Sequence, residues 1–559
     1  MPKSKITEVL DDLSSRRAVK YAVYVTAVGL FFALILLPPI LGIVVKWGTI
    51  RQVIDDQPLM NQALQAISYS FVIALFVSAL DIVAGIPMAW LISRGKSRWL
   101  SVLDTFSDIP FIVPTAALGY SLLLFWNRPE GLSSLFGTAL ISPGWLLVML
   151  LHFTFSYPVV VRVIVGAMLD YQLEYENASR TLGAPPFAVA RTVTFPIIKP
   201  SLIAAFILAF SRSLSETGAT LMVAGVFENG PAFIQNMKTG YLDGRVSQVT
   251  YEGSTVFASF VLIAVAFAIF MAIRVLGPRL KLPVKRFWPH IERTLSYTKA
   301  AAGRDGITIM VFVAIVLIPS LFVALPALQA IFTDALPNSL ASSGVWAQYW
   351  QSIGLSYALG AIATALNVVL GLPMAIIVAR RKFGTLISAA LDLLVNIPLI
   401  VPSIALGVSL SLFWKNFGFV PEIWLLVFAH LAITYPYFVR SMSAAVERID
   451  LDMEEASRTL GAKPFTVFKT IILPLTKYSI LSGAIMVFTR SVSETGATVA
   501  VTTTLQTAAV VIVNWVKASL SGQLIATPLE IGLGCGYLVL LSFIILLTLR
   551  LMVRGKGRY

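Results

Sequence analysis

The stretch ASRTLGAPPF at residues 178–187 recurs almost unchanged as ASRTLGAKPF at residues 456–465. The offset of 278 between 178 and 456 holds without a gap over residues 152–244, which align with residues 430–522. Upstream, LDTFSDIPFIVP at 103–114 matches LDLLVNIPLIVP at 391–402 with a small shift in offset. Internal repetition on this scale indicates that one complete structural unit occurs twice in the chain.

The composition is typical of an integral membrane protein. Of the 559 residues, 57% are hydrophobic and 13% are charged, and the mean hydropathy is +0.83. These values lie outside the range of soluble domains. Crossing about 30 Å of hydrocarbon takes roughly 20 helical residues. About twelve apolar runs are long enough, at 21–45, 66–93, 103–126, 144–168, 200–223, 251–276, 307–332, 352–379, 390–414, 422–446, 475–500 and 529–552. We therefore predict an all-α membrane protein built as two tandem six-helix halves.

The distribution of Lys and Arg predicts the orientation of these spans. Basic residues gather before the first run, after the second, sixth and eighth runs, and at the end of the chain, for example Arg16, Arg94, Arg279, Arg380 and Arg554. All these places fall on one side if the spans alternate, and the positive-inside rule puts that side in the cytoplasm. We expect both termini to be cytoplasmic in the plasma membrane, and the formal net charge of +14 requires no nucleic-acid partner. The polar residues before the first run, with no cleavage-site pattern after it, argue against a removable signal peptide.

The repeat also divides the chain. Residues 1–280 form the predicted first half, the basic and Pro-containing stretch 281–306 a cytoplasmic linker, and residues 307–559 the second half. Because each half has an even number of spans, both copies share one orientation and are related by a twofold axis along the membrane normal. The translocation pathway is expected between the halves.

One cytoplasmic loop in each half, at about 170–200 and 448–474, has the features of a docking element. Acidic residues open a short helix, where they suit the positive end of its dipole: Glu174 and Glu176, then Asp452, Glu454 and Glu455. Gly183 and Gly461 supply a left-handed stop for these helices. A short helix exposed between two spans is a poor core element, so we expect it to bind a partner.

These loops resemble the coupling loops of binding-protein-dependent (type I) ABC importer permeases, whose pattern is Glu-Ala-Ala, three residues, Gly, nine residues and Ile-x-Leu-Pro. The second half matches at Glu455, Ala456, Ser457, Gly461, Ile471, Leu473 and Pro474. The first half matches at Asn177, Ala178, Ser179, Gly183, Val193, Phe195 and Pro196, with Asn in place of the acid.

The resemblance implies that two cytoplasmic ATPase subunits dock on these loops and that an extracytoplasmic binding protein delivers the solute. ATP and Mg²⁺ would be held by the partner subunits, and this chain would bind no cofactor of its own. The coupling residues that it implies are Glu176, Asn177, Ala178, Ser179, Arg180, Gly183, Glu454, Glu455, Ala456, Ser457, Arg458 and Gly461.

The sequence contains no pattern of an active site. The tripeptide GKS at 95–97 is not a phosphate-binding loop, because the Gly required five residues earlier is replaced by Trp90. Zinc-binding, nucleophile-elbow and dinucleotide patterns do not occur, and the lone Cys535 offers no metal cluster or internal disulfide. We predict a transport subunit and no enzyme. The alternative is a twelve-span secondary transporter driven by an ion gradient, which needs titratable residues in the membrane and no ATPase dock.

A second repeated motif places charges inside an apolar run, as SRSLSETGATLMV at 211–223 and TRSVSETGATVAV at 489–501. Arg and Glu stand four residues apart in each copy, so they are expected to meet on one helix face. Two hypotheses remain open: a structural ion pair among close-packed helices, or a lining of the pathway near the twofold axis. The glutamates stand about 20 residues beyond Pro196 and Pro474, or roughly 30 Å along a helix, toward the outer half of the membrane. The pathway candidates are Arg212, Ser215, Glu216, Thr217, Arg490, Ser493, Glu494 and Thr495.

Other polar and Pro residues in the spans support structural hypotheses. Asp81 is matched by Asn367, which favours an interhelical hydrogen bond in both halves. His152 and His430 are interpreted as packing residues in preference to proton carriers. Pro110, Pro114, Pro398 and Pro402 are expected to kink the third spans, as parts of gates or as fits to their neighbours.

The substrate class follows only from resemblance. SETGAT resembles the Gly-Glu-Phe-Gly-Ala stretch of molybdate, tungstate, sulfate and ferric-iron permeases. The fusion of two halves is similar to that of ferric-iron, thiamine and phosphonate systems. The expected solute is a small oxyanion or a ferric iron species.

Overall fold

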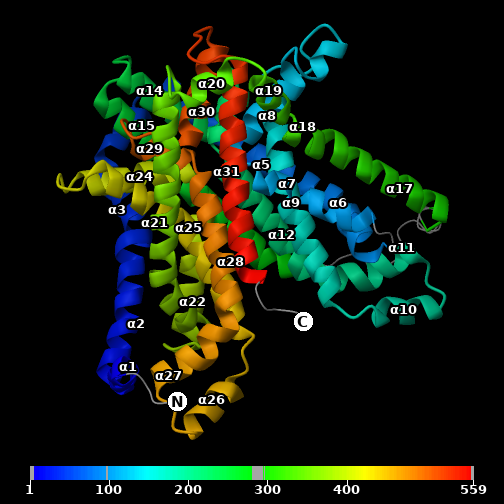
Figure 1. Ribbon diagram of the computed structural model, residues 1–559, viewed down its shortest axis with the longest axis vertical. Coiled ribbons are helices and arrows are strands. Elements are labelled where there is room, and N and C mark those ends of the chain that lie inside the picture. Colours follow the sequence, from blue (N-terminus) through cyan, green and yellow to red (C-terminus); the bar gives the residue numbers. More distant parts are fainter. Residues whose placement is uncertain (1–4, 96–98, 280–293, 295, 555–559) are drawn as a thin grey trace.

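The computed structural model describes residues 5–95, 99–279, 294 and 296–554 (Figure 1). Within these residues the regular structure is helical and no strand occurs. Ten helices are long and apolar enough to cross a membrane, and a bent pair adds an eleventh if it is counted as one span. The predicted all-α membrane fold is confirmed, with ten or eleven such helices where the sequence suggested about twelve.

The long helices follow the same order in the two halves. The first half contains α2, η1 and α3 (Arg17–Val45), α5 (Gln57–Arg94), α9 (Trp145–Asp170), α11, η4 and α12 (Pro186–Ser215), and α15 with η5 (Gln248–Arg279). The second half contains α17 to α19 (Thr298–Val311 to Ala324–Ile331), α21 (Trp346–Ala379), α25 (Glu422–Glu447), α27, η7 and α28 (Pro464–Val492), and α31 (Pro528–Arg554). Most of the predicted linker 281–306 lies outside the described residues, and α17 begins within its last part.

The third span of each half is broken, within the runs 103–126 and 390–414 in which the sequence predicts proline kinks. In the second half α22 (Thr385–Val395) and α23 (Ile397–Ile400) are followed by α24 (Ser403–Lys415), with a bend of 104°. In the first half the pieces are α6 (Trp99–Ser107), α7 (Ile109–Ile112) and α8 (Thr115–Asn127). Both breaks occur where Pro114 or Pro402 forces the preceding valine into an extended conformation, with ψ of 122° or 131°. The predicted proline kinks are confirmed.

The fifth span is also interrupted, inside the SETGAT motif. Helix α12 ends at Ser215 and α13 (Gly218–Val223) starts after two non-helical residues. In the second half α28 ends at Val492 and α29 covers Gly496–Val501. The expectation of one continuous helix through each motif is therefore wrong. Short helices α14 (Gly230–Leu242) and α30 (Ala508–Leu520) follow before the last span.

The two halves share their hydrophobic cores. Helix α2 packs on α21 and α3 packs on α24, so the first span of the chain lies against the second half. Within each half the tightest pairs are α5 with α9 and α21 with α25. These pairs contain the predicted interhelical bonds, because Ser156 donates to Asp81 and the Asn367 amide donates to Thr434 Oγ1 at 2.8 Å.

The two repeated loops that contain the ASRTLGA segments lie at one end of this bundle. Helix α10 (Glu174–Thr181) and helix α26 (Leu451–Thr459) are found at the lower end in Figure 1, and α14 and α30 are found at the upper end. The N-terminal helix α1 (Lys5–Ser15) lies beside α27 (Pro464–Val467) at the same lower end. Helices α10 and α26 therefore lie at the end of the molecule opposite to α14 and α30.

Candidate functional site

The glutamates of the two SETGAT motifs cap the short helices that follow them. Glu494 Oε1 accepts a hydrogen bond from the backbone N–H of Ala497 at 2.9 Å, and Glu216 Oε1 accepts one from Ala219 at 2.9 Å. Each carboxylate thus satisfies a donor in the first turn of α29 or α13, where negative charge is favourable. The two side chains are only 2% and 6% exposed. The break in the fifth span is what brings each carboxylate to this helix end.

The arginines of the motifs differ between the halves. Arg490 pairs with Glu494 at 2.5 Å, as the spacing predicted. Arg212 instead donates from Nε to the backbone oxygen of Phe155 at 3.2 Å, and its guanidinium lies 3.8 Å from the centre of the Phe155 ring. The residue that matches Phe155 in the repeat is Ile433, which offers no aromatic face for a cation. This substitution explains why the two arginines are held differently.

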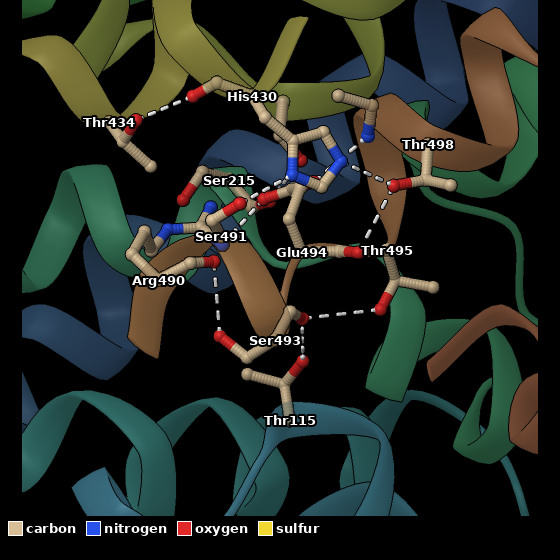
Figure 2. A network of polar contacts seen from close by, with 12 residues as sticks. Thr115, Ser215, His430, Thr434, Arg490, Ser491, Ser493, Glu494, Thr495 and Thr498 are labelled. Atoms are coloured by element: carbon tan, nitrogen blue, oxygen red, sulfur yellow. Dashed lines mark hydrogen bonds and ion pairs between the residues drawn. The ribbon is translucent and has the colours of Figure 1, made fainter. Parts of the chain in front are cut away.

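Both buried histidines are fully hydrogen-bonded. His430 Nδ1 lies 2.7 Å from Ser491 Oγ and Nε2 lies 3.0 Å from Thr498 Oγ1 (Figure 2). His152 has matching partners in Ser213 and Thr220, at 2.8 and 2.9 Å. Each threonine donates its hydroxyl proton to the backbone oxygen of the motif glutamate, so the ring Nε2–H is the donor and Nδ1 accepts from the serine. This neutral tautomer satisfies every atom, which agrees with the packing interpretation.

The motifs are joined across the interface by two symmetry-related hydrogen bonds. Thr115 at the start of α8 donates to the backbone oxygen of Ser493 at 3.1 Å (Figure 2). Ser403 at the start of α24 donates to the backbone oxygen of Ser215 at 3.1 Å. In both cases the broken third span of one half donates a hydrogen bond to a backbone oxygen of the other half. That oxygen has lost its intrahelical partner at the break in the fifth span.

The two motifs also touch each other. A Cβ placed on Gly218 would lie 2.5 Å from the Thr495 side chain, and one on Gly496 would lie 2.6 Å from Thr217 Oγ1. A cavity of about 10 Å³ beside Arg490, lined also by Ser215, is large enough for one water molecule. The eight pathway candidates are buried or half-buried in this conformation. Their role in lining an open pathway stays a prediction.

Each coupling helix is anchored to the end of the second span of its own half. Arg380 at the end of α21 binds Glu454 Oε1 at 2.8 Å and the backbone oxygen of Ile449 at 2.9 Å. Arg94 at the end of α5 binds Glu176 Oε1 at 3.1 Å. Both glutamates are buried, so they serve as anchors and are not available for contact with a partner.

The remaining coupling residues lie on an open face. Leu182 and Leu460 are 89% and 88% exposed at the tips of α10 and α26, and Asn177 and Glu455 are exposed beside them. Gly183 and Gly461 have φ of +87° and +82°, so the predicted left-handed stops are confirmed. Two isolated, nearly fully exposed leucines on short helices are consistent with a docking role, which remains a prediction.

The segments that precede the two halves cap the coupling loops in a crossed manner. Ser14 in α1 accepts a hydrogen bond from the backbone N–H of Phe465 at 3.0 Å. Ser296, before the second half, accepts one from the N–H of Phe187 at 3.3 Å. In the second loop Asp11 also accepts hydrogen bonds from the backbone N–H and the side-chain hydroxyl of Thr466, at 2.8 and 2.6 Å.

Sequence reasoning missed several of these residues. The sequence indicated Arg94 and Arg380 only as signals of membrane orientation. In the structure each binds a buried glutamate of the loop in its own half. The ion pairs of Arg162 with Asp104 and Asp108, at 2.8 and 2.5 Å, were not predicted either. The available signal was the repetition of arginine at 162 and 440 together with aspartate at 104 and 392.

Comparison with known proteins agrees with this geometry. Residues 81–282 and 371–554 each match the family described as "Binding-protein-dependent transport system inner membrane component", which together is more than half of the chain. The chain is 30% identical over 247 residues to the sulfate transport system permease protein CysT of Salmonella typhimurium, covering 42% of this chain and 84% of that protein.

Two further relatives differ in how much of the chain they cover. The putative ferric transport system permease protein FbpB 1 of Haemophilus influenzae is 25% identical over 457 residues, 78% of this chain and 70% of that protein. The molybdenum transport system permease protein ModB of Escherichia coli is 32% identical over 167 residues, 29% of this chain and 72% of that protein. With two copies of the matched domain arranged about one interface, the chain belongs to the family of binding-protein-dependent transport system inner membrane components and is a fused permease of that family.

Proposed function

We propose that this chain is the transmembrane component of an ATP-driven importer and supplies both halves of its translocation pathway. Two cytoplasmic ATPase subunits dock on α10 and α26, and an extracytoplasmic binding protein delivers the solute to the opposite end. ATP and Mg²⁺ are bound by the ATPase subunits. The observation that carries this proposal is the pair of exposed coupling helices, each tied by a buried ion pair to the end of a span.

The ion pairs define how movement is transmitted. A displacement of α26 by an ATPase pulls on Arg380 through Glu454 and so acts on α21. After α26 the chain passes through the turn at Gly461 into α27, η7 and α28, and α28 ends at the second SETGAT motif. A rigid connection from loop to axis is what an alternation between inward and outward access needs.

The orientation follows from the same assignment. Coupling loops that face ATPases are cytoplasmic, which agrees with the basic residues around them and places the protein in the plasma membrane with both termini inside. A gradient-driven transporter is less well supported, because the buried histidines and glutamates are held in complete hydrogen-bond networks and α10 and α26 would then have no role.

The solute is proposed to be a small oxyanion or a ferric iron species. Relatives named for sulfate and molybdenum transport match 42% and 29% of the chain, whereas the relative named for ferric transport matches 78% of it. The central cluster holds Arg212 and Arg490 beside two glutamates, so its charges nearly balance. Selection of the solute is therefore assigned mainly to the binding protein.

The test is ATPase coupling. The chain is purified with the ATPase encoded beside it, and Gly183→Val and Gly461→Val are compared with Gly183→Asn and Gly461→Asn. A β-branched residue is strained at positive φ whereas Asn tolerates it, so the Val variants distort the coupling helix ends and the Asn variants preserve them. Loss of co-purification and of stimulated hydrolysis in the Val variants alone is expected. Unchanged complexes in all four variants would overturn the proposal and favour the gradient-driven alternative.

A further inference from the structure

A cavity of about 550 Å³ lies between the N-terminal helices and the second coupling loop. Its walls come from α1 and α2 on one side and from α21, α27 and η7 on the other, and they are mostly apolar: Leu13, Val23, Leu372, Ile376, Phe465 and Phe468. This volume falls in the range of small-molecule sites. The cavity borders α26, so it lies beside the coupling loop of the second half.

The cavity has an excess of positive charge. Lys20, Arg380, Lys382 and Arg458 line it, and Glu454 is the only carboxylate among its lining residues. That carboxylate already binds Arg380 at 2.8 Å and Arg458 at 3.5 Å. Within the described part of the chain, no ion pair involves the side chain of Lys20 or of Lys382.

The crowding of these cations is unfavourable without an anion. Burial lowers the pKa of Lys382, and the nearby charges of Lys20 and Arg458 lower it further, whereas Glu454 opposes this shift. Lys382 lies outside the spans, in the short turn after α21. A bound anion between these side chains would relieve the repulsion.

The position of the cavity selects the kind of anion. The apolar walls continue along α2 and α21, which are spans, and the cations stand at the ends of these helices next to the coupling loop. Basic sites at such a level attract the anionic headgroups of the cytoplasmic leaflet. We propose that this cavity binds one anionic phospholipid, with the phosphate among Lys20, Lys382 and Arg458 and an acyl chain against the apolar walls. The cytoplasmic placement rests on the function proposed above.

The first half provides an internal comparison. A cavity of about 530 Å³ lies between α5 and α17 and includes Pro87, the repeat counterpart of Pro373 in the first cavity. Its lining contains one cation, Arg304, which pairs with Asp305 at 2.6 Å. Among the residues that the structure describes, the charge excess is therefore found only in the cavity beside the second coupling loop, where a bound lipid would join α1 and α2 to that loop.

The experiment measures lipid binding to the purified full-length chain in detergent by native mass spectrometry. Phosphatidylglycerol is the probe and phosphatidylcholine is the uncharged comparison. Each basic residue near a membrane surface contributes about fivefold to binding, so the Lys20→Gln, Lys382→Gln double variant is expected to bind phosphatidylglycerol roughly 25-fold more weakly. The matched control is Lys299→Gln with Arg304→Gln, which removes two charges near the other cavity and is expected to leave binding unchanged.

A second variant tests the apolar part of the cavity, where the acyl chain is proposed to bind. Val23→Trp fills the apolar wall and leaves every cation in place, so it is expected to weaken phosphatidylglycerol binding. Equal binding of phosphatidylglycerol and phosphatidylcholine would overturn the proposal, and so would an equal loss of binding in the control double variant. Displacement of phosphatidylglycerol by millimolar inorganic phosphate would also overturn it, because the site would then bind a free anion. No ATPase is present, so failure of this inference is separate from failure of the proposed function.

Discussion

Gly218 and Thr495 meet across the pseudo-twofold axis so closely that a Cβ on the glycine would lie 2.5 Å from the threonine side chain. Gly496 and Thr217 repeat the contact from the other side. The halves are therefore held together at their axis by backbone against side chain, at a distance that admits no added methyl group.

Gly218→Ala is expected to destabilise the closed conformation by about 1–3 kcal/mol, because the added methyl group overpacks this contact. The midpoint of thermal unfolding in detergent should fall, and adding Thr495→Gly should restore part of the loss. Gly354→Ala in α21 is the control, since nothing lies within 4 Å of its Cβ position. Equal unfolding midpoints for Gly218→Ala and the control would show that the halves do not touch here.

A second prediction concerns the unequal arginines. A double-mutant cycle with Arg490→Gln and Glu494→Gln should give a coupling energy of about 2 kcal/mol, whereas the Arg212→Gln and Glu216→Gln cycle should give less than about 1 kcal/mol. The difference arises because Arg490 pairs directly with its glutamate and Arg212 lies over Phe155. Phe155→Ile should raise the coupling in the first half toward that of the second. Equal coupling energies in both cycles would contradict this account.

The exposed leucines allow docking to be separated from folding. Leu182→Asp and Leu460→Asp should leave the free energy of unfolding within about 0.5 kcal/mol of wild type, since both side chains are exposed. Each should reduce co-purification of the ATPase and its stimulated hydrolysis. Leu340→Asp on α20 (Ala335–Leu340), an exposed leucine near the opposite end, is the control and should retain the complex. An intact complex in the first two variants would exclude α10 and α26 as the dock.

The buried side chain of Lys238 is expected to make the stability of the folded protein depend on pH. This side chain in α14 donates to the backbone oxygens of Val499, Ala500 and Thr502 at the end of α29. Burial, followed by the charge of Lys415, lowers its pKa to about 7 from 10.5, and Glu422 opposes the shift. Between these values the unfolded chain holds a proton that the folded chain lacks, and the neutral amine can donate only two of these three hydrogen bonds. The stability contribution of Lys238 therefore increases with pH and is lost as pH falls toward 7.

The measurement compares unfolding midpoints at pH 7 and pH 9. Wild type should gain stability over this interval relative to Lys238→Met, which carries no titratable group at this position. Lys517→Met, in the matching helix α30, compares the loss of a half-buried lysine whose pKa is also lowered by burial. A constant difference between wild type and Lys238→Met across this pH interval would show that Lys238 is charged in the folded protein throughout.

The sequence predicted the features that depend on repetition and local chemistry. The duplicated ASRTLGA segments, with acids before them and Gly after them, defined the coupling helices, and the left-handed Gly183 and Gly461 were found as expected. The prolines of the IPxIVP segments predicted the breaks in the third spans. These signals are local, because capping and steric restriction act within a few residues.

The break inside SETGAT was not predicted, because hydropathy does not register it. Apolar residues continue on both sides of Glu216, and the motif fits a helical periodicity. The helix ends there because the carboxylate folds onto the N–H of Ala219 and because Ser403 of the other half satisfies the freed backbone oxygen of Ser215. The second partner is distant in sequence, so only the assembled interface makes the break favourable.

The crossed capping of the coupling loops has a consequence for biosynthesis. The partner of Ser14 is Phe465, which is synthesised 451 residues later. The partner of Phe187 is Ser296, which is synthesised only 109 residues later. The first loop can therefore be finished while the second half is still being translated. The second loop is finished by a helix made at the very beginning, so α1 remains without its final contact until nearly the whole chain has been inserted.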